Sequence, residues 1–184
     1  MALRPQDSIP VFRGRKFHDW PFSAGSGRRP PGQEPTISTF GGGTIPYTKF
    51  AKNAIQGLVF TAHINHDLAP DPEYGRPHVH VYAPSAPGIG ADTVILRMTY
   101  QVRTIKGAYG PEVPETLPLV IGGIRGHILS FPQIPAADLA IGNQMTFLVQ
   151  RIGNDGADNY DDDLIFEEFD VHLQRTSLGT VEEF

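Results

Sequence analysis

The stretch Arg76-Pro-His-Val-His-Val-Tyr-Ala-Pro84 is a short apolar run with proline near both of its ends. Alternate side chains of an extended strand share one face of a sheet. His78, His80 and Tyr82 are therefore expected on one face, and the valines between them on the other. The stretch predicts a strand that presents neighbouring imidazoles on the same side of a sheet.

Imidazoles on one face of a strand raise the question of a metal site. His-x-His resembles the first half of the metal-binding signature of cupin enzymes, but that signature continues with a glutamate where this chain has Pro84. We therefore expect the histidines to be packed or hydrogen-bonded on a sheet face, without a bound metal. The alternative is a cupin-like metal-dependent enzyme that uses His78 and His80 with either His127 or His172.

The next segment, residues 92–105, alternates apolar and polar side chains. Its apolar face consists of Val94, Leu96, Met98, Tyr100 and Val102. Such alternation predicts a long antiparallel strand with one buried face. Further strands are predicted over residues 57–64, 115–121, 125–131, 145–152 and 164–174, with one short helical turn over residues 135–142.

Glycine and proline punctuate these predicted strands, with 20 Gly and 17 Pro in a chain of 184 residues. This composition favours short strands joined by many turns over a helical protein. The pair Gly122-Gly123 suits a turn or bulge between two of the strands. We predict an all-β fold, an antiparallel β-sandwich of jelly-roll type, over residues 56–184.

Residues 1–55 differ from the rest of the chain. The run Ser23–Pro35 is rich in glycine and proline, which disfavour helices and interior strands. Aromatic residues are nevertheless spread through this segment, and a purely disordered tail is poor in them. We predict an extended N-terminal arm that docks either on its own domain or on a neighbouring subunit. The candidate contacts are Phe12, Phe17, Trp20, Phe22 and Phe40.

The charge and composition of the chain limit its partners. The formal net charge is -5, which argues against a nucleic-acid surface because such a surface needs an excess of Lys and Arg. The chain has no cysteine, which excludes disulfides and thiolate metal sites. No segment has the run of apolar residues that a membrane helix requires. We expect a soluble, non-secreted product made in a cytoplasm, with no direct membrane or nucleic-acid partner.

The acidic loop at residues 154–163 is the strongest candidate for calcium. Hard cations prefer several carboxylate oxygens on a tightly turning chain. The EF-hand pattern fails when it begins at Asp155, because Ala157, Tyr160 and Phe166 stand at positions that need a ligand or glycine. A solvated hairpin loop is the expectation, and a structural calcium site is the alternative.

Known patterns of reaction centres are missing from the sequence. There is no Gly-x-Ser-x-Gly elbow, and Ser130 stands in an ordinary strand context. The glycine-rich run at residues 41–44 lacks the lysine of a phosphate-binding loop. We therefore predict a protein that is not an enzyme, with no catalytic residue and no cofactor.

Four spaced motifs lie between residues 77 and 179. They are Pro77-His-Val-His-Val81, Arg151-Ile-Gly-Asn-Asp-Gly-Ala-Asp-Asn-Tyr160, Phe169-Asp-Val-His-Leu173 and Ser177-Leu-Gly179. They resemble the motifs of a family of small virion proteins of tailed bacteriophages. The family carries a Pro-His-x-His strand, an Arg-x-Gly loop that ends in Asp-x-Tyr, and a closing Phe-Asp-x-His strand. The matching residues that we single out as structural are His78, His80, Asp158, Tyr160, Asp170 and His172. The resemblance covers residues 57–179.

The resemblance implies a β-rich structural subunit of the virion. Its most specific form is a capsid cement or decoration protein, a homotrimer on the capsid surface that stabilises the shell by bridging neighbouring subunits of the major capsid protein. A head-fibre or tail subunit is the alternative within the same class. An arm with aromatic anchors suits this role, because such anchors bury area over a wide surface and trimerisation adds avidity.

Overall fold

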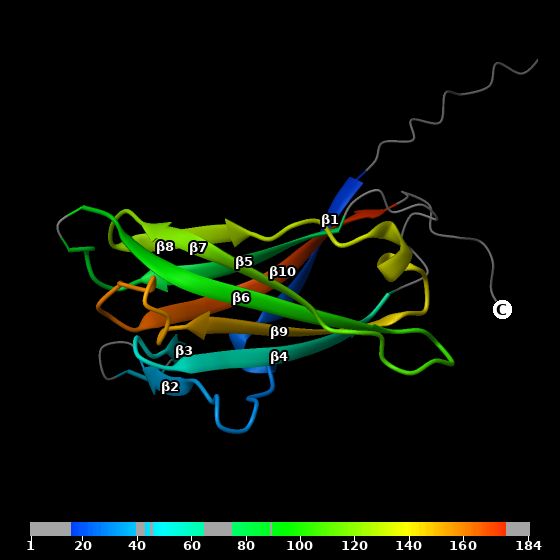
Figure 1. Cartoon of the computed structure of the whole chain (residues 1–184), viewed down its shortest axis with the longest axis horizontal. Helices are drawn as coiled ribbons and strands as arrows, with labels where there is room; N and C mark the ends of the chain where they lie inside the picture. Colours follow the sequence, from blue (N-terminus) through cyan, green and yellow to red (C-terminus); the bar gives the residue numbers. More distant parts are fainter. Residues whose placement is uncertain (1–15, 40–42, 45, 65–74, 89, 176–184) are drawn as a thin grey trace, which may run out of the picture.

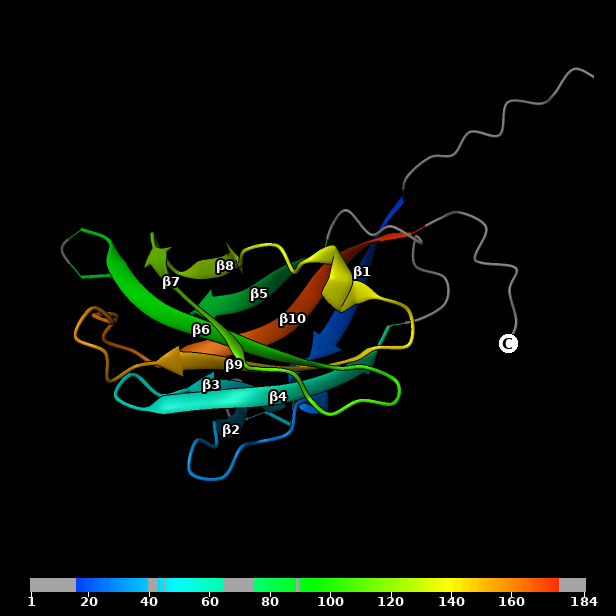
Figure 2. The ribbon, with the colours of Figure 1, turned by 45° about the vertical axis from the view of Figure 1, so that its right-hand side comes forward.

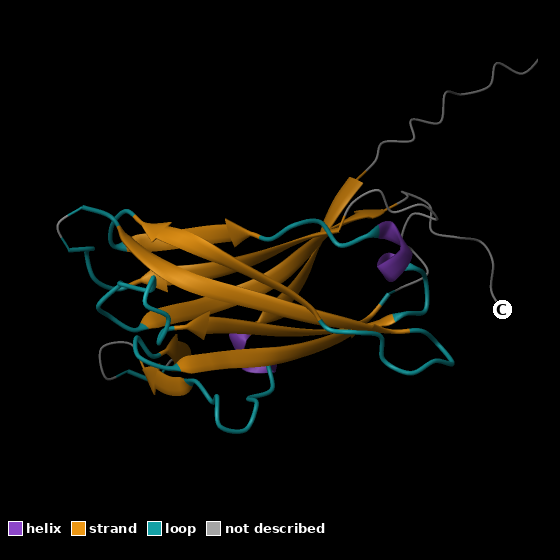
Figure 3. Ribbon diagram, in the orientation of Figure 1, coloured by secondary structure: helices purple, strands orange, loops and turns teal. Residues whose placement is uncertain are grey.

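The computed structural model describes residues 16–39, 43–44, 46–64, 75–88 and 90–175, and the side chains of residues 19–173 within them. Nearly all regular structure is β (Figure 3). The strands are β1 (Lys16–Ser23), β2 (Thr36–Thr39), β3 (Pro46–Phe50), β4 (Ile55–His63), β5 (Gly75–Ala83), β6 (Asp92–Arg103), β7 (Val113–Ile121), β8 (Arg125–Ser130), β9 (Gln144–Ile152) and β10 (Leu164–Arg175). Two short 3-10 turns are η1 (Ala24–Ser26) and η3 (Ala136–Leu139). In these ranges no helix is long and apolar enough to cross a membrane.

The strands form two antiparallel sheets that pack face to face (Figures 1 and 2). One sheet has six strands in the order β2-β3-β10-β5-β8, with β1 also paired to β10, and the other has four in the order β4-β9-β6-β7. From β3 to β10, each consecutive strand changes sheet, except at the β6–β7 hairpin. This strand order is that of a jelly roll, so the predicted fold class is confirmed.

The predicted strands coincide with β4 to β10, and η3 lies within the predicted helical turn. The alternation in β6 holds, since Val94, Leu96 and Met98 are fully buried. The Gly122-Gly123 pair does not close a hairpin. β7 pairs with β6 and β8 pairs with β5, so the two glycines lie where the chain crosses between sheets.

Aromatic side chains fill the space between the sheets. Phe22, Phe60, Phe147 and Phe169 are buried, and the ring centroid of Phe169 lies 5.6, 5.6 and 5.0 Å from those of Phe22, Phe60 and Phe147. These phenylalanines come from β1 and β10 of one sheet and from β4 and β9 of the other. Rings at this spacing gain stability beyond their buried area, so the two sheets are joined by a connected aromatic core.

The predicted arm over residues 1–55 needs correction, because much of it belongs to the sandwich. β1 pairs with β10 from Lys16–Arg175 to Ser23–Glu168, and β3 pairs with the beginning of β10. Phe22 is buried in the core, and Trp20 packs against it with ring centroids 5.3 Å apart. Alternate residues of β1 face the core, so these two side chains contact their own domain rather than a partner.

The remaining predicted arm contacts are less defined. The backbone of Phe17 pairs with Gln174, and its side chain is not described. Phe12 and Phe40 lie outside the described residues.

Both edges of the four-stranded sheet are protected. At the β4 edge, Arg28 and Val59 exchange backbone hydrogen bonds of 2.8 and 2.7 Å, and the Gly57 amide donates to the Gln33 carbonyl at 3.0 Å. At the other edge, β7 carries Pro114 and Pro118, which have no amide hydrogen to offer. Such devices are common on strands that would otherwise present an open ladder.

We predict that Phe22→Ala lowers the free energy of unfolding by about 3–5 kcal/mol, because it removes a buried ring that contacts both sheets. Denaturant unfolding followed by circular dichroism measures the change. Val120→Thr is the matched control, since Val120 is 58% exposed on β7 and its replacement is expected to shift stability by less than about 0.5 kcal/mol. An equally small effect of Phe22→Ala would mean that residues 16–23 do not belong to the core.

Candidate functional site

A group of polar side chains lies on the outer face of the six-stranded sheet, and we call it the histidine–aspartate cluster. Its members are His78 and His80 of β5 and Asp170 and His172 of β10. In the β5–β10 ladder, His78 is the partner of Asp170 and His80 that of Glu168. The neighbouring Val79 and Phe169 are fully buried in the core, so alternation turns the polar residues outward.

Asp170 is the centre of this cluster. One carboxylate oxygen, Oδ2, lies 3.3 Å from His80 Nε2 and 3.7 Å from His172 Nε2. His172 Nε2 also lies 3.0 Å from Asp19 Oδ1, on β1. Only 4% of Asp170 is exposed, although it lies on the outer face, and its second oxygen, Oδ1, is buried without a hydrogen-bond partner. One oxygen of the carboxylate thus has histidine partners, and the other has no hydrogen-bond partner among the described residues.

His78 is the second buried member, with 9% of its surface exposed. Its Nδ1 is hydrogen-bonded to Ser130 Oγ at 2.8 Å, and its Nε2 is buried without a partner. Burial, and next the charge of His172, lower the pKa of His78 below its ordinary value. A lower pKa favours the neutral ring. In the tautomer in which Nδ1 donates to Ser130 Oγ, Nε2 has a free lone pair and can act as an acceptor or ligand.

The Ser130–His78 pair differs from that of a serine hydrolase. In a Ser-His-Asp triad, the serine contacts Nε2 and the carboxylate orients the ring through Nδ1. Here the serine holds Nδ1, and Nε2 has no hydrogen bond with a described residue. The geometry suits orientation of the ring better than activation of the hydroxyl. The sequence gives Ser130 only an ordinary strand context, because its partner lies 52 residues away.

The structure separates the two versions of the cupin-like alternative. His78, His80 and His172 share the outer face, whereas His127 is the ladder partner of the core residue Val81 and contacts the Gly123 carbonyl at 3.2 Å. In place of His127, the outer face supplies Asp170. Its spacing of two residues from His172 on one strand was the sequence signal that paired them.

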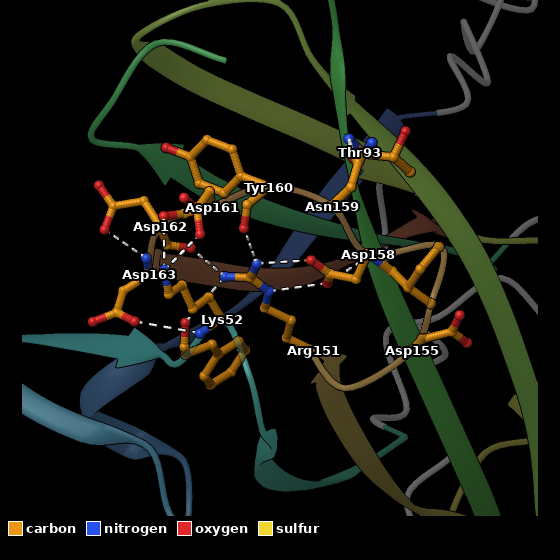
Figure 4. A network of polar contacts seen from close by, with 12 residues as sticks. Lys52, Thr93, Arg151, Asp155, Asp158, Asn159, Tyr160, Asp161, Asp162 and Asp163 are labelled. Carbon is orange, nitrogen blue, oxygen red and sulfur yellow. Dashed lines mark hydrogen bonds and ion pairs between the residues drawn. The ribbon is translucent and has the colours of Figure 1, made fainter. Parts of the chain in front are cut away.

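A second network surrounds Arg151, which is fully buried at the end of β9 (Figure 4). Its guanidinium donates to both oxygens of Asp158, at 3.0 Å from Nε and 2.8 Å from Nη2. Three further bonds reach the backbone carbonyls of Phe50, Tyr160 and Asp162 at 3.3, 2.9 and 2.7 Å. Arg151 and Asp158 of the motif Arg151–Tyr160 therefore form a buried bidentate ion pair that organises the loop.

Tyr160 and Asp158 extend this network to other parts of the sandwich. The Ile95 amide of β6 donates to Asp158 Oδ2 at 3.1 Å. The Tyr160 hydroxyl donates to the Ser85 carbonyl at 3.0 Å, and the Ser85 amide donates to the same hydroxyl at 3.1 Å. Asp158 and Tyr160 of the motif are thus hydrogen-bonded structural residues of the loop.

The other carboxylates of the acidic loop point to separate partners. Asp161 pairs with Lys52 at 2.5 Å, and Asp163 pairs with Lys49 at 2.6 Å. Asp155 accepts a hydrogen bond from the Ala157 amide. Of the described residues, a single group brings three His, Asp or Glu ligand atoms within 4.8 Å of one another, and it consists of His78, Asp170 and His172. The carboxylates of the loop do not converge as a calcium site requires.

A polar pocket of about 350 Å³ lies beside this loop. Its lining includes Ser85, Asp92, Asn159, Tyr160 and Asp161. Tyr160 is only 2% exposed, and its ring faces the Arg151 guanidinium at 5.8 Å. The Tyr160 ring is therefore a buried part of the pocket wall.

Gly153, the glycine of the Arg-x-Gly motif, sits where two segments of backbone meet. A Cβ at this position would lie 2.6 Å from the Lys52 carbonyl oxygen and 2.7 Å from that of Ala51. The Gly153 amide donates to the Ala54 carbonyl at 3.0 Å. Any side chain would force the β3–β4 connection away from the loop.

We predict that Asp158→Asn destabilises the protein by about 3–5 kcal/mol, because it leaves the buried Arg151 guanidinium without a countercharge. Thermal and denaturant unfolding measure the change. Asp161→Asn is the control: it breaks an exposed ion pair in the same loop and is expected to leave stability unchanged. Equal effects of the two variants would contradict the structural role of the buried pair.

We predict that Gly153→Ala costs about 1–3 kcal/mol, because the added methyl group collides with backbone that is held by its own hydrogen bonds. Gly156→Ala serves as the control, since a Cβ there has no atom within 4 Å. Unfolding curves of both variants provide the comparison. If Gly153→Ala is as stable as Gly156→Ala, the close approach is not a constraint.

Comparisons with known proteins give distant structural likenesses and no family. No family model and no curated protein matches the chain. Similar solved structures include the CBM36-1 domain of a multidomain xylanase from the hindgut metagenome of Trinervitermes trinervoides (TM-score 0.46, 12% identity, 84% of this chain and 96% of that chain). A second is a xylan-binding domain from CBM 22 (TM-score 0.44, 16% identity, 87% of this chain and 92% of that chain). A third is the C-terminal family 22 carbohydrate binding module of Clostridium thermocellum Xyn10B (TM-score 0.43, 14% identity, 86% of this chain and 91% of that chain).

Proposed function

We propose that this protein is a non-enzymatic structural subunit of a bacteriophage virion, in its most specific form a trimeric capsid cement protein that bridges neighbouring capsid subunits. The observation that carries the proposal is the placement of the motif residues. Arg151, Asp158 and Tyr160 hold one loop by buried hydrogen bonds, and Gly153 allows that loop to touch the β3–β4 connection. The motif thus maintains the shape of the sandwich.

The absence of an oriented nucleophile supports a structural role within the described residues. Ser130 is paired with the wrong imidazole nitrogen for a triad, and Tyr160 is engaged through its hydroxyl. A protein whose motif residues fix its shape, and whose serine is not activated, suits a subunit that meets partners by its surface. Head-fibre and tail positions in the particle are the alternatives to the capsid surface.

The contacts with the major capsid protein are assigned to the N-terminal region outside the core. Trp20 and Phe22 are used inside the sandwich, so Phe12, Phe17 and Phe40 remain the proposed aromatic anchors toward a neighbour. Extended segments of this kind bind weakly as single copies and tightly as a trimer, because the copies engage together.

The test combines the oligomeric state with particle location. Light scattering of the purified chain is expected to give three times the chain mass, and peptides of the chain are expected in the mass spectrum of purified particles of the virus that encodes it. Added chain is expected to cosediment with particles that lack it, and Phe12→Ala with Phe40→Ala to weaken that cosedimentation without changing the mass of the free protein. A monomer that is absent from particles and sediments with insoluble xylan would replace the proposal with a carbohydrate-binding role.

A further inference from the structure

Two buried polar atoms of the histidine–aspartate cluster lack hydrogen-bond partners among the described residues. They are His78 Nε2 and Asp170 Oδ1, on cross-strand partner residues that are 9% and 4% exposed. Buried polar atoms are nearly always satisfied in folded proteins, so two such atoms on paired residues leave room for a water molecule or an ion. Beyond the virion role, we propose that His78, Asp170 and His172 bind a divalent transition-metal ion, with Zn²⁺ the best match.

The ligand atoms have the chemistry of such a site. The three residues bring ligand atoms within 4.8 Å of one another from the adjacent strands β5 and β10. Zn²⁺ accepts imidazole nitrogen and carboxylate oxygen at about 2.0–2.2 Å, and rotation of the half-exposed His172 draws the set together around an ion. Imidazole ligands favour Zn²⁺, Co²⁺ or Ni²⁺ over Ca²⁺ and Mg²⁺, which prefer oxygen alone.

His78 and Asp170 each have a partner that positions them, as residues around metal ions generally do. Ser130 holds His78 through Nδ1, which directs Nε2 to the site. His80 contacts Asp170 through Oδ2 and leaves Oδ1 free. Asp19 lies 3.0 Å from His172 Nε2 and brings another carboxylate to the edge of the site.

Three protein ligands leave at least one coordination position open. The ligands belong to the two central strands of the six-stranded sheet, so an ion would clamp β5 to β10 on the outer face. Because that face is on the surface of the sandwich, the open position is accessible to water or to a donor from a neighbouring molecule. A bound ion would therefore stabilise the sheet and offer one coordination position to a neighbouring molecule.

Zinc titration of the metal-free full chain by isothermal calorimetry tests the site, with the zinc content of dialysed protein measured in parallel. Wild type is expected to bind one ion per chain. His172→Ala, on a half-exposed side chain, is expected to lower affinity by more than about 100-fold, and Ser130→Ala, which removes only a positioning partner, by about 10–100-fold. Cobalt(II) is a second probe, since its visible spectrum reports imidazole ligation directly.

His63→Ala is the matched control, because His63 is an exposed histidine at the end of β4 on the other sheet. It is expected to bind zinc like wild type. Circular dichroism checks that each variant is folded. His172→Ala is chosen over a substitution of the buried Asp170 because its side chain is partly exposed and its loss is easier to tolerate. Zinc binding absent from folded wild type, or equally strong in His172→Ala and His63→Ala, would overturn the proposal. Trimer mass and particle binding measured in chelator test the virion role separately.

Discussion

The buried ion pair between Arg151 and Asp158 is the constraint on which most of the jelly roll depends. A guanidinium without solvent is stable only when its donors are used, and here they reach Asp158 and the carbonyls of Phe50, Tyr160 and Asp162. These partners belong to β3, to the loop and to the approach to β10. The single side chain thus fixes how the chain leaves one sheet and enters the centre of the other.

The local pattern of side chains was enough to predict the strands and the fold class. It failed where the structure depends on pairing between strands that are far apart in the sequence. The alternation in β6 and β10 is visible in the sequence because each strand has one face in the core. The same alternation exists in Trp20 and Phe22, but the glycines and prolines that follow them suggested an arm. Nothing local indicates that β10 has an edge free to pair with β1. Likewise, Gly122-Gly123 has the composition of a hairpin turn and serves as a crossing between sheets.

The histidine–aspartate cluster shows a similar limit of prediction. Period-two alternation placed His78 and His80 on one face, and that placement agrees with the structure, which adds His172 from β10. The burial of Asp170 was not predictable, because it depends on a register shift between Phe166 and Glu168 and on the rings that surround the carboxylate. The role of Ser130 depends in turn on the β5–β8 ladder. Chemistry of this kind arises from cross-strand neighbours rather than from neighbours in the sequence.

The protected edges of the four-stranded sheet also limit how copies of this chain associate at high concentration. Residues 28–33 occupy part of the β4 ladder, and the prolines of β7 interrupt the opposite one. A strand from another copy finds no continuous row of donors and acceptors there, so this sheet does not template fibril growth. Copies of this chain that meet at high concentration therefore contact one another through side chains rather than through backbone pairing at this sheet.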